Sequence, residues 1–275
     1  MKILKGNTHA LVEAWRLLNQ HRVLAFEMAR REIFDRYSGQ ALGLFWTVAH
    51  PIFMMGLYVF IFVFVFKTKI SADIAMPLDY TTYILAGLIP WLAFQESLSK
   101  TCVAITSNAN LVKQVVFPIE VLSVKSVLAS GVTQVISTVL LLLYVLIAQK
   151  TVWPSFLLIP ILMVFQLLMM IGLGFMLSVS SAFFRDLKDF VQLYCLAGVY
   201  LLPVFYLPEW IPSVFKPLVY LNPFSYMVWC YQDAIYFGGF KHPVAWVVFP
   251  LMSIVTFVMG YRLMRRLKPM LGNVL

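Results

Sequence analysis

The 275-residue chain carries little charge: Asp, Glu, Lys and Arg make up 12% of it, and hydrophobic residues make up 61%. Soluble domains are about 25% charged and about 45 to 50% apolar, so a globular protein of this size could not bury so much apolar surface. Apolar runs of about 20 residues recur along the whole length, and each is long enough to cross a hydrocarbon layer of about 30 Å. This composition excludes a soluble enzyme and indicates an all-α integral membrane protein.

Cysteine is also scarce. The three cysteines, Cys102, Cys195 and Cys230, are odd in number and far apart in the sequence. This spacing indicates neither a disulfide framework nor a CxxC metal site, and it favours small buried apolar residues. We therefore expect no metal site in this chain.

Motifs for catalysis and for ion coupling are missing as well. The sequence has no GxxxxGK[ST] loop to cradle a nucleotide phosphate, so the chain cannot hydrolyse ATP by that route. Asp73, Asp79, Glu209 and Asp233 are not grouped as the paired carboxylates of a glycosyl- or acyltransferase. Midplane carboxylates and an internal repeat, typical of secondary transporters, are not evident. His50 stands alone in apolar surroundings.

What is present is a series of apolar runs separated by short charged clusters. The net charge of +9 lies in these clusters, which is the pattern that orients membrane spans and not that of a nucleic-acid-binding surface. Six spans place both termini on one side, where 16 of the Lys and Arg residues lie, against 5 on the other, so both termini are predicted to be cytoplasmic. The predicted spans are residues 41–66, 80–104, 122–148, 155–182, 190–206 and 244–263.

Residues 207–237 break this series, because several prolines lie among aromatic residues there and no full span fits. Two short helices joined by turns are predicted, as a re-entrant hairpin between spans 5 and 6. Asn222 and Pro223 predict the N-cap and first residue of one helix, which should run towards Tyr236 and end at Gly238-Gly239.

Residues 1–40 are predicted to form a cytoplasmic amphipathic segment that precedes a membrane domain of residues 41–275. Val23, Phe26, Ile33 and Tyr37 fall on one helical stripe, which should face lipid or the bundle while the charged side faces water. Simple orientation of the N-terminus needs only a few Lys or Arg residues. The mixed signs of the charges here suit a protein partner better than orientation alone.

The stretch RREIFDRYSGQALGLFWTVAHP, residues 30–51, resembles the N-terminal signature of the membrane subunits of type-2 ABC exporters for cell-surface polysaccharides, the permeases for O-antigen, capsule and teichoic acid chains. The resemblance covers nearly the whole chain. Later motifs of that family are matched in order by LIPWLAFQESLSKT (88–101), SNANLVKQVVFPIEVL (107–122), FFRDLKDFVQ (183–192), and PVFYLPEWIP followed by LNPFSYMV (203–228).

The resemblance implies a non-catalytic permease in the bacterial inner membrane: a homodimer of six-span subunits above a separate cytoplasmic ATPase dimer that binds ATP and Mg²⁺. The implied substrate is an undecaprenyl-linked polysaccharide, whose pyrophosphate Arg30 and Arg31 are expected to attract. An exporter of a drug or lipid in the same superfamily is the alternative, and an ion-coupled transporter is less favoured. The implied gate and coupling surface comprises Glu27, Arg30, Arg31, Glu32, Asp35, Arg36, Tyr37, Lys113, Arg185 and Asp186.

Two kinds of side-chain stripe are candidates for the wall of a sugar pathway. Aromatic rings recur along the first and fifth predicted spans, and such rings stack on pyranose C–H faces without demanding one sugar sequence. Small hydroxyl groups along the third span offer a hydrophilic wall. Lipid-facing rings and close helix packing are the respective alternatives. The candidate channel residues are Trp46, Phe53, Phe60, Phe64, Ser126, Ser130, Thr133, Tyr194, Tyr200, Phe205 and Tyr206.

Three ionisable residues lie near the inner boundary of the predicted spans. Glu96 and Lys100 are four residues apart, close enough on a helix to pair, and Lys125 begins the third span. Ionisable groups in membranes are functional candidates, but snorkelling and local pairing explain these three equally well. The Gly-Leu-Gly stretch at 172–174 is predicted to mark tight helix packing.

Overall fold

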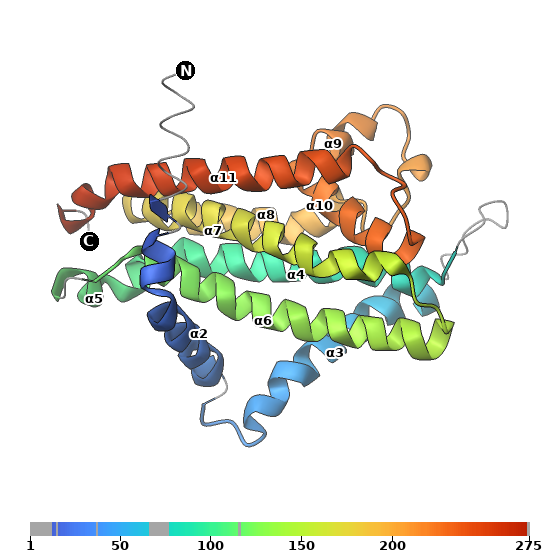
Figure 1. The fold of residues 1–275 in the computed structure, drawn as a ribbon, viewed down its shortest axis with the longest axis horizontal. Coiled ribbons are helices and arrows are strands. Elements are labelled where there is room, and N and C mark those ends of the chain that lie inside the picture. Colours follow the sequence, from blue (N-terminus) through green and yellow to red (C-terminus); the bar gives the residue numbers. More distant parts are fainter. Residues whose placement is uncertain (1–12, 15, 37, 66–76, 115–116, 274–275) are drawn as a thin grey trace.

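The computed structural model describes residues 13–14, 16–36, 38–65, 77–114 and 117–273, and every regular element within these ranges is helical. The long helices run roughly parallel through a bundle (Figure 1). They are α4 (Tyr80–Val103), α6 (Glu120–Tyr144), α7 (Ile159–Phe183) and α11 (Ala245–Leu267). The Gly172 and Gly260 backbones touch where α7 crosses α11, because a Cβ on Gly260 would lie 2.0 Å from the Gly172 carbonyl oxygen. The tight packing predicted for residues 172–174 is confirmed.

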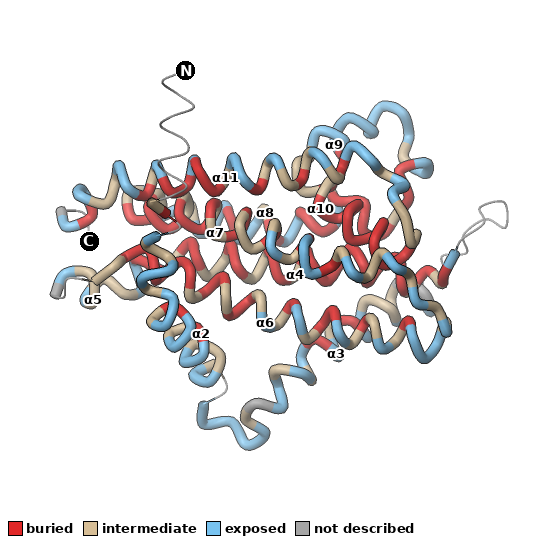
Figure 2. The backbone as a smooth tube through the Cα atoms, viewed as in Figure 1, coloured by how far each residue is buried: buried red, intermediate tan, exposed pale blue. Residues whose placement is uncertain are grey.

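Three helical stretches of the described chain are long and apolar enough to cross a membrane: Glu120–Gln149, Pro154–Phe183 and Ala245–Gly272. They contain α6, α7 and α11 with their adjoining turns. Helix α4 has 24 residues but is more polar. It lies in the middle of the bundle, where most of it is surrounded by protein (Figure 2). Protein packing therefore explains how α4 tolerates hydroxyls and charges within a long helix.

Two shorter helices flank this core. Helix α3 (Trp46–Val59) contains Pro51 and continues as a π-helical turn over Phe60–Val65. Helix α8 (Leu187–Leu201) ends earlier than the predicted fifth span, since residues 202–206 are not helical. Pro203 explains the early end, because proline lacks an N–H and disfavours helical geometry in the residue before it.

The non-helical residues 202–206 are mostly buried, so their backbone groups need partners inside the protein. The Tyr83 hydroxyl donates to the carbonyls of Pro203 (3.3 Å) and Tyr206 (3.1 Å). Gln232 also donates to the Pro203 carbonyl, at 2.8 Å. The side chains of Tyr83 in α4 and of Gln232 therefore hold this break in place.

The predicted short helices after residue 207 are present as α9 (Lys216–Tyr220) and α10 (Pro223–Gln232). The Asn222 side chain accepts a hydrogen bond from the Phe224 N–H at 3.1 Å, so the predicted N-cap is confirmed. A π-helical turn at Asp233–Phe237 extends α10, and Gly238 ends it with a φ of +66°. The Asp233 carboxylate is fully buried and accepts hydrogen bonds from the backbone N–H of His242 and the indole N–H of Trp246.

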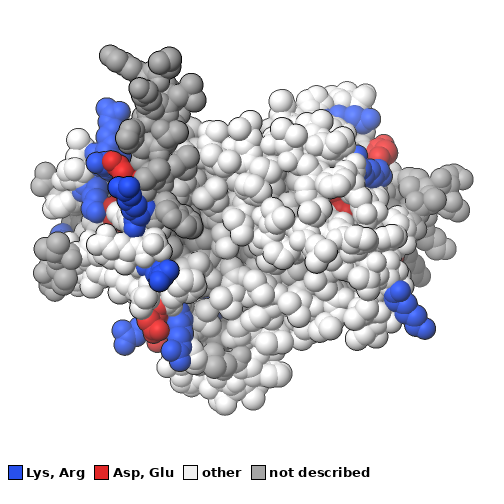
Figure 3. All heavy atoms as spheres, in the orientation of Figure 1, with Lys and Arg blue, Asp and Glu red and all other residues white. Residues whose placement is uncertain are grey.

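Charge separates the molecule into two ends with an uncharged belt between them (Figure 3). Helix α2 (Arg22–Arg36), the short α5 (Ala109–Gln114) and the C-terminal turn Lys268–Asn273 lie at the same end (Figure 1). Glu120, at the start of α6, pairs there with Lys268 at 2.8 Å. The three cysteines are buried and unpaired, as predicted.

Candidate functional site at the α2 end of the bundle

The face of α2 that packs on the bundle differs from the predicted apolar stripe. Ala25 and Ala29 are each 4% exposed, whereas Val23 and Phe26 are 68% and 64% exposed. Continuing along the buried face by helical spacing, the next residue is Glu32, followed by Arg36. The small alanine side chains let α2 approach α6 closely. The packed face of α2 therefore consists of small apolar residues followed by two charged ones.

Five charged side chains from three helices meet beside this face, and we refer to them as the α2 ion-pair network: Glu32, Arg36, Glu96, Lys100 and Lys125. Glu96 of α4 pairs with Arg36 of α2 and, at 2.8 Å, with Lys100. Lys100 lies 3.5 Å from Glu32, and Lys125 of α6 lies 3.7 Å from the same carboxylate. The predicted pairing of Glu96 with Lys100 is confirmed.

The network is partly shielded from water. The exposed fractions of its side chains range from 17% for Lys125 to 28% for Arg36. Ion pairs at this depth are screened less than surface pairs, and removal of one partner leaves a charge that water solvates poorly. The two carboxylates share three cations, so each carboxylate makes contacts in two directions. Ser126 of α6 also donates to Glu32 at 3.1 Å.

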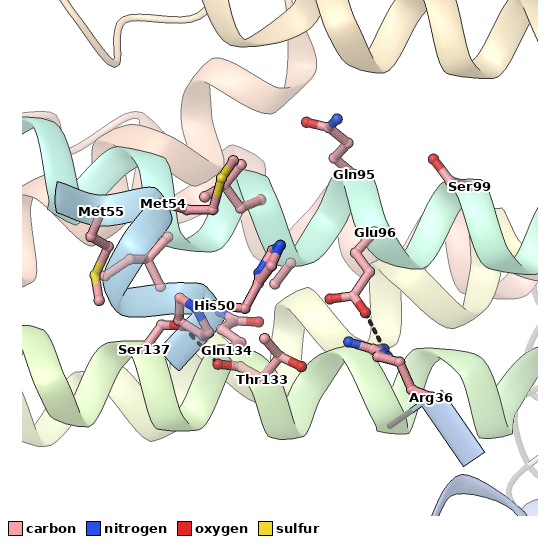
Figure 4. Close-up of a pocket in the computed structure, with 14 residues that line it drawn as sticks. Arg36, His50, Met54, Met55, Gln95, Glu96, Ser99, Thr133, Gln134 and Ser137 are labelled. Carbon is pink, nitrogen blue, oxygen red and sulfur yellow. Dashed lines mark hydrogen bonds and ion pairs between the residues drawn. The ribbon is translucent and has the colours of Figure 1, made fainter. Parts of the chain in front are cut away.

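A cavity of about 380 Å³ adjoins the network, between α3, α4 and α6 (Figure 4). One part of its lining is apolar and comes from α3 and α4; the other is polar and includes the Arg36–Glu96 pair. The apolar residues are Pro51, Met54, Met55, Ile89, Leu92 and Ala93, and the polar ones are Arg36, His50, Gln95, Glu96, Ser99, Thr133, Gln134 and Ser137. The expectation that His50 has only apolar surroundings is therefore wrong.

The polar wall of the cavity continues into the core through Gln134. Its amide donates to Gln166 of α7 at 2.7 Å and to the hydroxyl of Tyr231 in α10 at 3.0 Å. Gln166 in turn donates to the carbonyl of Pro90 in α4, at 2.8 Å. Buried amides of this kind are stable in an apolar bundle only with such partners. The cavity wall is thereby tied to the helices behind it.

A multi-pass apolar bundle with a charged helix packed against one end points to a membrane transporter. Residues 24–236 match the model of the ABC-2 type transporter family. The chain belongs to this family. It is accordingly a multi-pass membrane protein of the permease type, and the resemblance on which its fold was predicted is confirmed.

Several curated proteins that this chain is similar to have names that refer to polysaccharides. The O-antigen export system permease protein RfbA of Klebsiella pneumoniae is 25% identical over 90% of this chain and 93% of its own length. A protein of the same name from Myxococcus xanthus is 29% identical, over 82% and 85%. The polysialic acid transport protein KpsM of Escherichia coli is 22% identical, over 86% and 90%. These matches support a type-2 ABC polysaccharide exporter permease.

The residues predicted to contact an ATPase fall into two groups. Glu32 and Arg36 belong to the α2 ion-pair network, and Tyr37 lies outside the described residues. The others are exposed at the charged end, where Arg185 also borders a second cavity of about 310 Å³ with Lys188. Their role in coupling stays a prediction. The exposed members are Glu27, Arg30, Arg31, Asp35, Lys113, Arg185 and Asp186.

The predicted channel residues are also divided. Most of the aromatic ones are exposed: Trp46 39%, Phe53 69%, Phe60 57%, Phe64 64% and Tyr200 60%. Tyr194 and Tyr206 are partly buried, while Phe205 is buried and stacks on Tyr58, with ring centroids 5.7 Å apart. Ser126 and Ser130 are buried inside the protomer, and Thr133 lines the cavity. Whether a sugar chain contacts any of them stays a prediction.

Sequence reasoning did not identify Gln95, Ser99 or Gln134 as neighbours of the charged residues. One signal was present: Glu32 and Arg36 are four residues apart, and so are Glu96 and Lys100. On two helices this spacing places a charge pair on one face of each. If the two helices are known to be neighbours, these two charge pairs predict ion pairs between them.

Proposed function

We propose that this chain is the transmembrane subunit of an ATP-driven exporter that moves a lipid-linked polysaccharide across the bacterial inner membrane. Two copies would form the transport path between them, and a separate ATPase dimer would bind ATP and Mg²⁺. The chain itself would carry no catalytic residue. The family match and the printed names of the polysaccharide permeases among its relatives support this proposal.

The observation that carries the proposal is the row of exposed aromatic rings on α3 and on the π-helical turn that continues it. Phe53, Phe60 and Phe64 are each more than half exposed, and the rings of Phe60 and Phe64 lie 6.4 Å apart in a stacked arrangement. Rings of this kind offer flat faces to pyranose C–H groups, and several in series suit a long sliding polymer. The exposed Tyr200 of α8 would contribute to the same wall.

The ATPase would bind at the charged end of the bundle. Arg30 and Arg31 are exposed there on α2, Lys113 on α5, and Arg185 on the turn before α8. The same end holds most of the basic residues, which favours a cytoplasmic location for both termini in a six-span topology. The hairpin of α9 and α10 at the opposite end would re-enter the membrane on the outer side.

The lipid-linked substrate would approach the same charged end from the inner leaflet. Its pyrophosphate would pair with Arg30 and Arg31, because a guanidinium group binds phosphate oxygens with two parallel hydrogen bonds. Arg30 is 69% exposed and lies 4.0 Å from Glu27, so its guanidinium is accessible to such a ligand. Replacement of both arginines by glutamine should weaken binding of the lipid-linked substrate while the protein still inserts.

A reconstitution experiment tests the proposal. The chain and its proposed partner ATPase would be placed in vesicles with undecaprenyl-linked polysaccharide, and the polymer reaching the opposite face would be measured. We expect ATP-dependent transfer that needs both proteins. Transfer without the ATPase, or transfer only of short lipids or drugs under the same conditions, would contradict the proposed cargo and energy source.

A further inference from the structure

Helix α2 is held to the bundle by apolar contacts and by the ion-pair network. Its buried residues are Ala25 and Ala29, and the partly buried Leu24 and Met28 also pack against the apolar core at this end. The attachment of α2 to α4 depends on Arg36 and Glu32, which reach Glu96 and Lys100. The ion pairs therefore supply the side-chain connection between α2 and α4.

Two further members of the network, Glu96 and Lys100, lie on α4, most of which is buried in the bundle. Helix α4 packs against α6, α7, α8 and α10. A displacement of α4 would thus reach most of the bundle, because packed helices transmit strain. Arg36 and Glu96 also line the cavity between α3, α4 and α6, so a change in their pairing changes one end of that cavity.

We propose that Glu96, Lys100 and Lys125 are positioning residues that seat α2 on the bundle and transmit its movement to α4 and α6 during transport. The inference rests on the proposed function, in which an ATPase acts on α2. The three residues touch neither ATP nor polysaccharide; they act through Glu32 and Arg36. An ion-pair contact suits this role, because partly hydrated charges exchange partners at less cost than apolar side chains separate.

Charge reversal of the Arg36–Glu96 pair, singly and together, separates the effect of this ion pair from the effect of the net charge of the protein. In Arg36→Glu, a carboxylate on α2 faces Glu96; in Glu96→Arg, a guanidinium on α4 faces Arg36 and Lys100. The double variant leaves two carboxylates on α2 opposite three cations on α4 and α6, so attraction across the contact returns. The net charge of the double variant equals that of the native chain.

The seating of α2 can be measured with a cysteine in its buried face. Ala29→Cys is suitable because Ala29 is 4% exposed and the native cysteines are buried. We expect a water-soluble maleimide to label this cysteine roughly tenfold faster in each single reversal than in the native background, and at the native rate in the double variant. In the native complex with its ATPase, ATP turnover should itself increase labelling.

Glu120→Gln is the matched control. Its carboxylate is 5% exposed and pairs with Lys268 at 2.8 Å at the same end of the bundle, but this pair joins α6 to the C-terminal turn and not to α2. The control should leave labelling of Ala29→Cys unchanged. Thermal unfolding midpoints of all variants, measured in detergent, identify any general loss of fold.

The outcomes separate the inference from the function on which it rests. An unchanged labelling rate in both single reversals would overturn the seating role. An equal labelling rate of Ala29→Cys with and without ATP turnover, in the otherwise native complex, would overturn the transmission role. Support requires, in addition, that each single reversal raises the ATP hydrolysed per polymer exported and that the double variant lowers it again. If no polysaccharide moves while the labelling series behaves as expected, the cargo is wrong and the network's role in seating and moving α2 stands.

Discussion

Helices α4 and α3 border the same cavity, but their surroundings are opposite. Most of the 24 residues of α4 are buried, whereas α3 buries only Pro51 and Met55 among its 14 residues. The aromatic side chains differ in the same way: Trp91 and Phe94 of α4 are 0% exposed, and Phe53 of α3 is 69% exposed. One helix is enclosed by its own protomer, while the other presents apolar rings outward.

This difference separates residues whose position is fixed by contacts within the chain from residues whose neighbours lie outside it. The position of α4 follows from contacts within the chain, so substitutions there should change stability first. The outer face of α3 has no such contacts, and lipid, a second copy or cargo must cover it. Substitutions on that face should change transport and leave the stability of the protomer nearly unchanged.

The largest expected effect is that of Trp91→Ala. The Trp91 ring packs against Phe94 at a centroid distance of 5.7 Å and against Tyr194 and Phe224, and it fills the space left by the missing side chain of Gly198. Removal of a buried indole should lower the free energy of unfolding by about 3 to 5 kcal/mol. Denaturant or thermal unfolding in detergent measures this loss.

Trp46→Ala supplies the comparison on α3, because Trp46 is 39% exposed. It should cost less than about 1 kcal/mol of unfolding free energy. Equal losses for the two tryptophan variants would mean that α3 is as firmly packed as α4, and the contrast between the helices would fail.

Gly260→Ala should have the next largest effect. A Cβ there would lie 2.0 Å from the carbonyl oxygen of Gly172, so α7 and α11 would have to separate. Overpacking of this kind costs about 1 to 3 kcal/mol, measurable as a lower unfolding midpoint. Gly56→Ala on α3 is the matched control: a Cβ on Gly56 meets nothing within 4 Å, and alanine favours the helix, so stability should stay equal or rise. A stabilised Gly260→Ala would contradict the close crossing.

The helical class and most helix positions followed from hydropathy, because apolar runs must be helical when lipid surrounds them. The N-cap at Asn222 and the stop at Gly238 were also predictable, since both depend on local backbone chemistry. The early end of α8 was missed, although Pro203 signals it. A single proline is tolerated within α3 and within α4, so proline alone does not decide where a membrane helix ends.

The five charged residues of the α2 ion-pair network were singled out from the sequence, but their arrangement across three helices, and that of the polar residues of the adjoining cavity, was not. Glu96 and Lys100 were paired correctly because both lie on one helix. Their contacts with Arg36 and Glu32 join positions 60 and 68 residues apart in the chain, and helical periodicity says nothing about which helices are neighbours. The sequence likewise left open whether the apolar stripe of α2 faces lipid or the bundle, because periodicity identifies an apolar stripe but not what it faces.

Tyr83→Phe should have a smaller effect than either packing variant. Its hydroxyl is the donor to the carbonyls of Pro203 and Tyr206, and phenylalanine keeps the ring while leaving these buried carbonyls with fewer donors. The expected loss is about 1 kcal/mol of unfolding free energy. On α3, Tyr58→Phe keeps the ring contact with Phe205 and should change stability by less. A larger loss at Tyr58 than at Tyr83 would contradict the role assigned to α4 in holding residues 202–206.

The smallest change in stability, within about 0.5 kcal/mol, is expected for substitutions at Phe53, on the outer face of α3, and at Phe60, on the π-helical turn that continues it. Their effect on transport distinguishes stacking on sugar rings from contact with lipid. Leucine keeps the apolar character but lacks a flat π face, whereas tyrosine keeps the ring. If these rings stack on the polymer, Phe53→Leu and Phe60→Leu should slow export in the vesicle assay several-fold, and the tyrosine variants should not. If they only face lipid, leucine should be tolerated and the added hydroxyl of tyrosine should be the more harmful change, so the order of the two substitutions decides which surrounding α3 has.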